Sequence, residues 1–100
     1  MNKTATGPRY QLRLYIAGPG PYANRAKQGL ADAAAGAGFD YDLEVIDLCA
    51  EPHRAIVDRV VVTPTMVKLS PLPRAIVIGD LSDCEKIVAA LGVQNRTQRD

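Results

Sequence analysis

Two hydrophobic periods follow one another at the start of this chain, and their succession restricts the folds that it can adopt. Residues 10–16 alternate polar and apolar side chains, which is typical of a strand with one buried face. Its predicted core residues are Leu12, Leu14 and Ile16. Residues 23–37 are rich in alanine and place apolar side chains at helical spacing, and Gly36 and Gly38 end the pattern. The pattern predicts a strand followed directly by a helix.

A third apolar segment, residues 41–48, predicts that the helix connects two strands. Tyr41, Leu43 and Val45 share one face of this strand, whereas Ile46 and Leu48 make its end apolar on both faces. A strand that is buried on both faces normally lies inside a sheet. We therefore expect the second strand to occupy a central position.

The next part of the chain predicts shorter elements. A Glu-Pro pair precedes residues 53–59 and predicts a short helix there, because proline is tolerated at the first helical position. The β-branched run 60–62 fits either the end of this helix or the start of a strand. The following strand, residues 63–69, must carry Pro64 at its start, since proline cannot donate to the ladder.

The last elements are predicted to be a strand and a helix. A turn at residues 70–73 and the apolar run 75–78 predict a buried strand that returns antiparallel to its predecessor. Ser82 and Glu85 have the spacing of a capping box, which predicts a helix over residues 82–91.

The resulting order, βαβαββα, is that of a thioredoxin-like α/β fold. In oxidoreductases of this type a Cys-x-x-Cys pair stands where the first strand meets the first helix, and the helix dipole stabilises the thiolate. The corresponding junction here, residues 18–24, contains no cysteine. We therefore expect a scaffold that binds rather than reacts. Residues 1–100 should form one domain with an ordered core at about 9–92 and frayed termini.

Charge and composition restrict the class of partner. Twelve basic and eleven acidic residues give a net charge of +1, which is too small to recruit nucleic acid or an anionic membrane. The sequence has neither a signal-peptide pattern in its first eight residues nor a run near the roughly 18 apolar residues of a membrane span. We therefore expect a cytoplasmic protein whose cysteines, Cys49 and Cys84, are free thiols.

The residue types also argue against a cofactor or a metal centre. His53 and two distant cysteines are too few to enclose a metal ion. The glycines before the first helix lack both the dinucleotide-binding pattern and a Gly-Lys-Ser/Thr sequence, so a turn is expected there. Asp42 and Glu44 share the exposed face of a strand, where they would solvate the sheet or decorate an interaction edge. We expect no cofactor, no metal and no catalytic residue.

Four sequence blocks stand out by their order and spacing. They are LYIAG at 14–18, EVIDL at 44–48, TPTMVK at 63–68, and PLPR at 71–74 with IGDLSD at 78–83. Together they resemble the KaiB family of circadian clock proteins over about residues 10–92. The resemblance implies a non-enzymatic protein that binds the N-terminal ATPase ring of the hexameric kinase KaiC. In full oscillators it also implies the capture of KaiA on that ring, and a clock histidine kinase is a further candidate partner.

The resemblance also implies two alternative folds of one sequence. One is the thioredoxin-like monomer, which binds KaiC, and the other is a βαββααβ ground state, usually a tetramer. The segment 82–91 is a helix in the first fold, whereas residues 87–91 contribute a strand in the second. Ala90 stands where the cyanobacterial proteins typically carry glycine, and alanine favours a helix by about 0.5–1 kcal/mol. We therefore expect the thioredoxin-like form.

The resemblance suggests four residues near the KaiC-facing surface or its support. These partner-binding candidates are Tyr10, Arg59, Val60 and Arg74. Ordinary sheet packing or surface solvation would also account for them. Three further residues are expected to be architectural: Pro64 in a cis-proline turn, Gly79 at a close backbone approach and Asp80 at the entry to the last helix.

One alternative function stays open at this point. A thioredoxin-fold redox protein or sensor could use a single cysteine, and Cys84 falls in the first turn of a predicted helix, where the dipole favours a thiolate.

Overall fold

The computed structural model describes residues 9–79, 81 and 83–92; the termini that were expected to fray, Asp80 and Ser82 lie outside these residues. The predicted order βαβαββα is confirmed, and the protein has a thioredoxin-like fold. The elements are β1 (Tyr10–Ile16), α1 (Pro21–Ala37), β2 (Tyr41–Asp47), α2 (Arg54–Asp58), β3 (Thr65–Ser70), β4 (Ala75–Ile78) and α3 (Cys84–Leu91).

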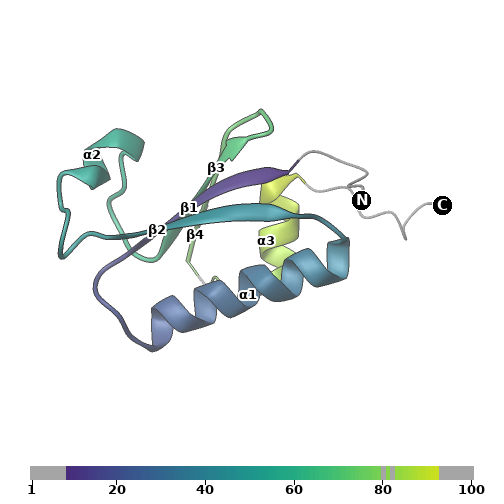
Figure 1. The fold of residues 1–100 in the computed structure, drawn as a ribbon, viewed down its shortest axis with the longest axis horizontal. Coiled ribbons are helices and arrows are strands. Elements are labelled where there is room, and N and C mark those ends of the chain that lie inside the picture. Colours follow the sequence, from purple (N-terminus) through teal and green to yellow (C-terminus); the bar gives the residue numbers. More distant parts are fainter. Residues whose placement is uncertain (1–8, 80, 82, 93–100) are drawn as a thin grey trace.

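The four strands form one sheet in the order β2-β1-β3-β4 (Figure 1). β1 pairs in parallel with β2 and antiparallel with β3, and β4 pairs antiparallel with β3. The predicted central position of the second strand is therefore wrong, because β2 lies at an edge of the described sheet. The end of β2 is buried on one face only: Ile46 is buried, whereas Val45 on the other face is partly exposed.

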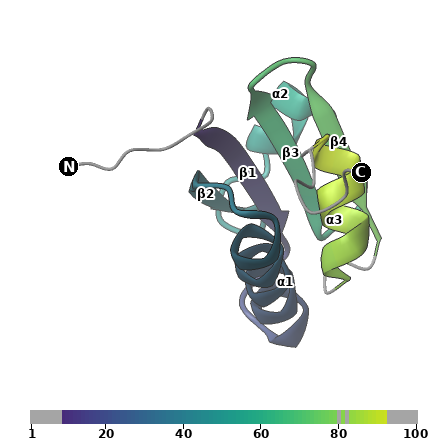
Figure 2. The ribbon, with the colours of Figure 1, turned by 90° about the vertical axis from the view of Figure 1, so that its right-hand side faces the viewer.

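Helices α1 and α3 cover one face of the sheet, as Figure 2 shows. The predicted inward residues Leu12, Leu14 and Ile16 are all buried there. Small side chains on α1 face them, so that the helix can lie close to the strands; the buried ones are Ala23, Ala26 and Ala33. The opposite face carries a second, smaller cluster made of Tyr15, Ile46 and Val67. Helix α2 lies on that second face, where its last residue contacts Tyr15.

The ends of the long helices have identifiable causes. α1 begins at Pro21, earlier than predicted, because proline suits the first helical turn. It ends where Gly38 adopts a left-handed conformation (φ 75°). The N-cap of α3 is Asp83, whose carboxylate accepts hydrogen bonds from the backbone N–H groups of Glu85 and Lys86. The capping box predicted from Ser82 and Glu85 is therefore wrong by one position.

The β-branched run 60–62 belongs to neither a helix nor a strand. β3 begins after it, at Thr65, whose hydroxyl donates a 2.6 Å hydrogen bond to the carbonyl oxygen of Val62. β4 is less buried than predicted, since only Val77 is fully covered while Ile76 and Ile78 are about half exposed. The reason is that β4 forms the second edge of the sheet and turns these two side chains to the face opposite α1 and α3.

Candidate partner-binding site

A buried carboxylate lies at the end of α2. Asp58 is 4% exposed, and its Oδ2 accepts a 2.5 Å hydrogen bond from the hydroxyl of Tyr15 and a 3.1 Å hydrogen bond from Nη1 of Arg13. Its Oδ1 accepts a hydrogen bond from Nη2 of Arg74. Arg13 and Tyr15 stand two residues apart on one face of β1, and Arg74 lies in the turn between β3 and β4. One carboxylate therefore joins three separate parts of the chain.

This environment keeps Asp58 ionised. Burial raises its pKa, but hydrogen bonds from Tyr15 and Arg13, together with the guanidinium charges, outweigh burial and hold the pKa below its ordinary value of 3.8. Burial and the bond to Asp58 raise the pKa of Tyr15, and the same carboxylate raises the pKa of Arg13. At neutral pH the group consists of one anion, two guanidinium cations and a neutral phenol.

A second, more exposed set of ion pairs borders this group. Nε of Arg13 donates to Glu44 on β2 at 3.2 Å, and Nη2 of Arg54 donates to the other oxygen of Glu44 at 2.9 Å. Arg54 also bonds Glu51 at 3.1 Å. The guanidinium of Arg54 is the main cause that lowers the pKa of Glu44. Exposed pairs of this kind contribute little to stability individually, but they orient the start of α2 toward β2.

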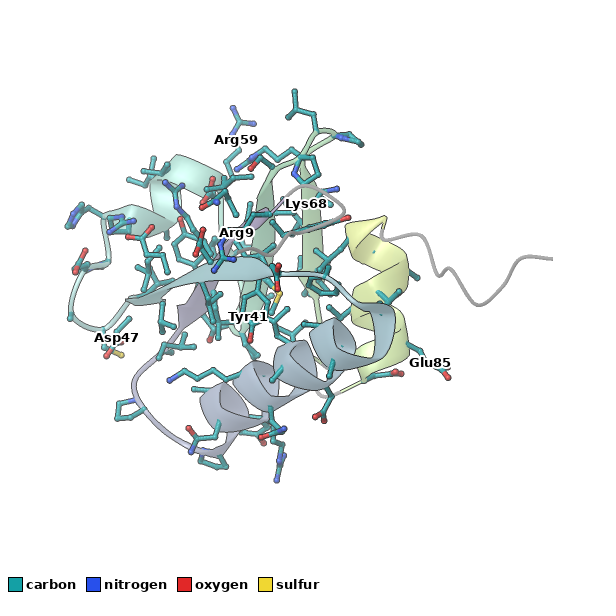
Figure 3. The ribbon with its side chains drawn as sticks, turned by 45° about the vertical axis from the view of Figure 1, so that its right-hand side comes forward. Arg9, Tyr41, Asp47, Arg59, Lys68 and Glu85 are labelled. Carbon is teal, nitrogen blue, oxygen red and sulfur yellow. The ribbon has the colours of Figure 1, made fainter. Side chains whose placement is uncertain are left out.

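The outer surface of α2 and of the chain after it is apolar. Ile56, Val57 and Val61 are 79%, 62% and 85% exposed, and Val62 is half exposed. Arg59 falls between them in the sequence, and its exposed side chain lies at the outer edge of the molecule in Figure 3. We call these five residues the α2 surface. Several exposed apolar side chains within seven residues of chain that also carry an exposed cation are typical of a protein-binding surface rather than of a catalytic centre.

Three of the four predicted partner-binding residues lie in this region. Arg59 is exposed and adopts a left-handed backbone conformation (φ 55°), which ends α2. Val60 is half-buried and packs against the cluster that contains Tyr15. Arg74 is held by Asp58. The structure thus brings Arg59, Val60 and Arg74 to one side of the sheet.

Tyr10, the fourth candidate, lies on the other face of the sheet. Its ring is buried against Phe39, with 5.0 Å between the ring centroids, and Nζ of Lys68 lies 5.6 Å from its centroid. Tyr10 therefore supports the fold from the core, and it is not part of the α2 surface.

The architectural candidates have different outcomes. The Thr63–Pro64 peptide bond is cis, as predicted. Gly79 is not at a close backbone approach, because a Cβ added there would meet only Nζ of Lys86 at 3.9 Å. Its φ of 106° is what requires glycine. Ala90 lies in α3 and packs against the main core.

A pocket of about 760 Å³ lies at the junction of β1 and α1. Mostly apolar residues of the junction and of α1, together with Pro64, line it, and its described lining contains no cysteine. The exposed Cys49 lies nearby, with its Sγ 4.0 Å from the position that a Cβ on Gly18 would take. The backbone N–H groups of Cys49 and Gly18 both donate 2.9 Å hydrogen bonds to Oδ1 of Asp47, the last residue of β2, which Figure 3 labels. The described lining of this pocket therefore supplies no thiol nucleophile.

Two further properties hold for the described residues. Among residues 9–79, 81 and 83–92, no three His, Cys, Asp or Glu side chains are grouped so that they could hold a metal ion. In the same part of the chain, every helix is too short or too polar to cross a membrane.

Sequence reasoning missed the group around Asp58. The signal available was the polar face of β1, where Arg13 and Tyr15 stand two residues apart and therefore point the same way. Their common partner could not be identified, because Asp58 lies 43 residues beyond Tyr15 in a helix of only five residues.

Comparison with known proteins gives a consistent result. The KaiB domain model matches residues 13–93. The circadian clock protein KaiB3 of Synechocystis sp. is 36% identical over 89 residues, which cover 85% of this chain and 84% of that protein. The circadian clock oscillator protein KaiB of a Synechococcus strain is 42% identical over 84 residues, with coverages of 82% and 81%.

A solved structure extends the similarity to three dimensions. The N-terminal domain of Synechococcus elongatus SasA superimposes with a TM-score of 0.68 at 26% identity, covering 94% of this chain and 93% of that domain. The domain match, the identities and the shared fold agree with one another. This chain belongs to the KaiB family of circadian clock proteins.

Proposed function

We propose that this protein is a non-enzymatic clock module that binds the N-terminal ATPase ring of a KaiC-type kinase and modulates its phosphorylation state. The observation that carries the proposal is the combination of KaiB-family membership with a thioredoxin-like fold in which residues 84–91 are helical. The resemblance assigns KaiC binding to this form. A KaiA-like protein or a clock histidine kinase is a further partner of the same kind.

The α2 surface supports the proposal on physical grounds. Its exposed valines and isoleucine can be desolvated by a partner at little cost, and Arg59 supplies a charge that selects for an acidic neighbour. The surface carries no chemistry of its own. A module of this kind acts through binding energy alone, so that it can change the kinase only by preferring one of its states.

The test is a binding titration against a KaiC-type hexamer in its ATP-loaded and ADP-loaded forms. Fluorescence anisotropy of the labelled chain measures both dissociation constants. We expect the two constants to differ by tenfold or more, since roughly 1.4 kcal/mol of preference is needed for a tenfold shift in populations. Equal affinities for both forms, or no binding to either, would refute the proposal.

Matched variants locate the contact. Arg59→Ala and Val61→Ala shorten exposed side chains of the α2 surface and should weaken binding. Lys27→Ala removes an exposed cation from α1, on the other side of the sheet, and serves as the control. If the control weakens binding and the α2 variants do not, the partner contacts another face.

A further inference from the structure

Helix α2 is attached to the sheet by polar contacts and not by apolar side chains. All five residues of α2 are described, and Asp58 is the one that is buried. Ile56 and Val57, which could have packed against the strands, face solvent instead. Surface helices are normally held by an apolar stripe that faces the core. α2 is held by a carboxylate, together with the exposed ion pairs of Arg54.

The bonds of Asp58 reach across the sheet. β1 contributes Tyr15 and Arg13, and the turn between β3 and β4 contributes Arg74. A buried carboxylate that loses such partners carries an uncompensated desolvation cost, so the three bonds act together. While Asp58 makes these bonds, the position of α2 is fixed relative to β1 and to the turn between β3 and β4.

The chain that follows α2 depends on the same anchor. Residues 59–64 form no helix or strand, and Arg59 adopts the left-handed conformation that ends α2 immediately after Asp58. The amide of Val60 donates a 2.9 Å hydrogen bond back to the carbonyl oxygen of Ala55 within α2. A shift of α2 would therefore move Arg59, Val61 and Val62, which carry much of the α2 surface.

We propose that Asp58 is a positioning residue that holds the α2 surface in the arrangement a protein partner binds. The proposal rests on the proposed function for the identity of the partner. Asp58 itself would act only by fixing the position of α2. The side chain of Asp58 is buried and cannot reach a partner itself. It acts by joining α2 to β1 and to Arg74, so that the exposed residues are presented in one arrangement rather than in several.

The first experiment measures the position of α2 without any partner. Hydrogen exchange of the Ile56 and Val60 amides, followed by NMR on the full chain, reports local opening of this segment. Asp58→Asn keeps the size of the side chain and removes its charge. We expect exchange at both amides to accelerate about tenfold or more, while the amides of β1 in the sheet retain their relative protection.

Two variants of Arg74 distinguish the loss of the Asp58 bonds from unfolding of the whole domain. Its side chain is partly exposed in a turn, so Arg74→Ala should fold, and it should accelerate exchange at Ile56 and Val60. Arg74→Lys keeps the cation and should restore slow exchange. Asp42→Asn is the matched control, since Asp42 is an exposed carboxylate that pairs with Arg9 on the same side of the sheet.

The second experiment measures affinity for the ATPase ring with the same variants. Because Asp58 is buried, a tenfold loss of affinity in Asp58→Asn reports altered presentation of the α2 surface and not a lost contact. Unchanged exchange at Ile56 and Val60, acceleration of equal size throughout the sheet, or faster exchange with unchanged affinity would each overturn the proposal. If the wild-type chain does not bind the ring, the proposed function fails, and the exchange data still decide whether Asp58 fixes α2.

Discussion

Lys68 on β3 donates a 2.7 Å hydrogen bond through its Nζ to the carbonyl oxygen of Leu91, the last residue of α3. Lys68 is almost fully buried, and its ammonium group also lies over the ring of Tyr10. The last carbonyl groups of a helix have no partner within the helix, and a cation there also compensates the negative end of the dipole. A strand residue thus caps the helix that distinguishes the two folds suggested by the KaiB resemblance.

Lys68→Met should therefore destabilise α3. Methionine keeps the length of the side chain but leaves the carbonyl oxygen of Leu91 without its donor, which costs about 1–3 kcal/mol. Urea unfolding followed by circular dichroism measures the loss. Lys86→Met, which removes an exposed lysine from the same helix, is the control and should change stability by less than about 0.5 kcal/mol.

Arg59→Gly should be more stable than Arg59→Ala. Both substitutions remove the same guanidinium group, but only glycine adopts the left-handed conformation of this position without strain. The expected difference in unfolding free energy is about 1 kcal/mol. If both variants unfold at the same urea concentration, the backbone of residue 59 does not hold this conformation in solution. Both should bind the ATPase ring more weakly than the wild type.

The stabilisation from Asp58 should disappear in acid. Its pKa is lowered in the folded state, so its contribution is complete above the unfolded pKa and is lost as the pH falls through the folded pKa, below 3.8. The wild type should therefore be more stable than Asp58→Asn at pH 6, and the gap should narrow as the pH falls below 4. Denaturant unfolding at a series of pH values measures the gap, and a constant gap would contradict the assignment.

Ala90→Gly should shift the balance of folds. Glycine weakens α3 by about 0.5–1 kcal/mol, which matters if a second fold lies within a few kcal/mol. Backbone chemical shifts of residues 84–91 and light scattering follow the shift toward a strand and toward a tetramer. Strand-like shifts in the wild-type protein would mean that packing overrides the helix preference of this segment.

The double variant Cys49→Ala, Cys84→Ser should retain its binding activity. Cys49 is exposed, and the pocket at the β1–α1 junction contains no cysteine in its described lining. Affinity for the ring should stay within about tenfold of the wild type, which corresponds to roughly 1.4 kcal/mol. Loss of binding in the folded variant, or insulin reduction by the wild type, would favour the redox alternative.

Local patterns predicted most of the fold. The inward residues of β1 and the order of the elements follow from periodicity and turn residues, which act over a few positions. The position of β2 could not be predicted in this way. Strand order depends on which side of β1 is occupied by β3, and nothing in residues 41–48 encodes that choice. The sequence pattern predicts the cap of α3 one residue too early, because Ser82 and Asp83 are both good N-cap residues.

The candidate site was predicted in part. Arg59, Val60 and Arg74 came from the KaiB resemblance and lie on one side of the sheet. Asp58 was not predicted, because its importance depends on contacts with residues that are distant in sequence. An acidic residue in a short helix at the surface normally faces solvent. Only the tertiary structure shows that this one is buried.

Among the described residues the sheet has two edge strands, and each is protected in a different way from growth by strand addition. β2 carries the ionised side chains of Asp42 and Glu44, which an incoming strand would have to strip of water. β4 has only four residues and follows a turn that contains Pro71 and Pro73, neither of which can donate to a neighbouring strand. A small open sheet can therefore expose isoleucines on its surface and still resist the edge-to-edge stacking that leads to amyloid.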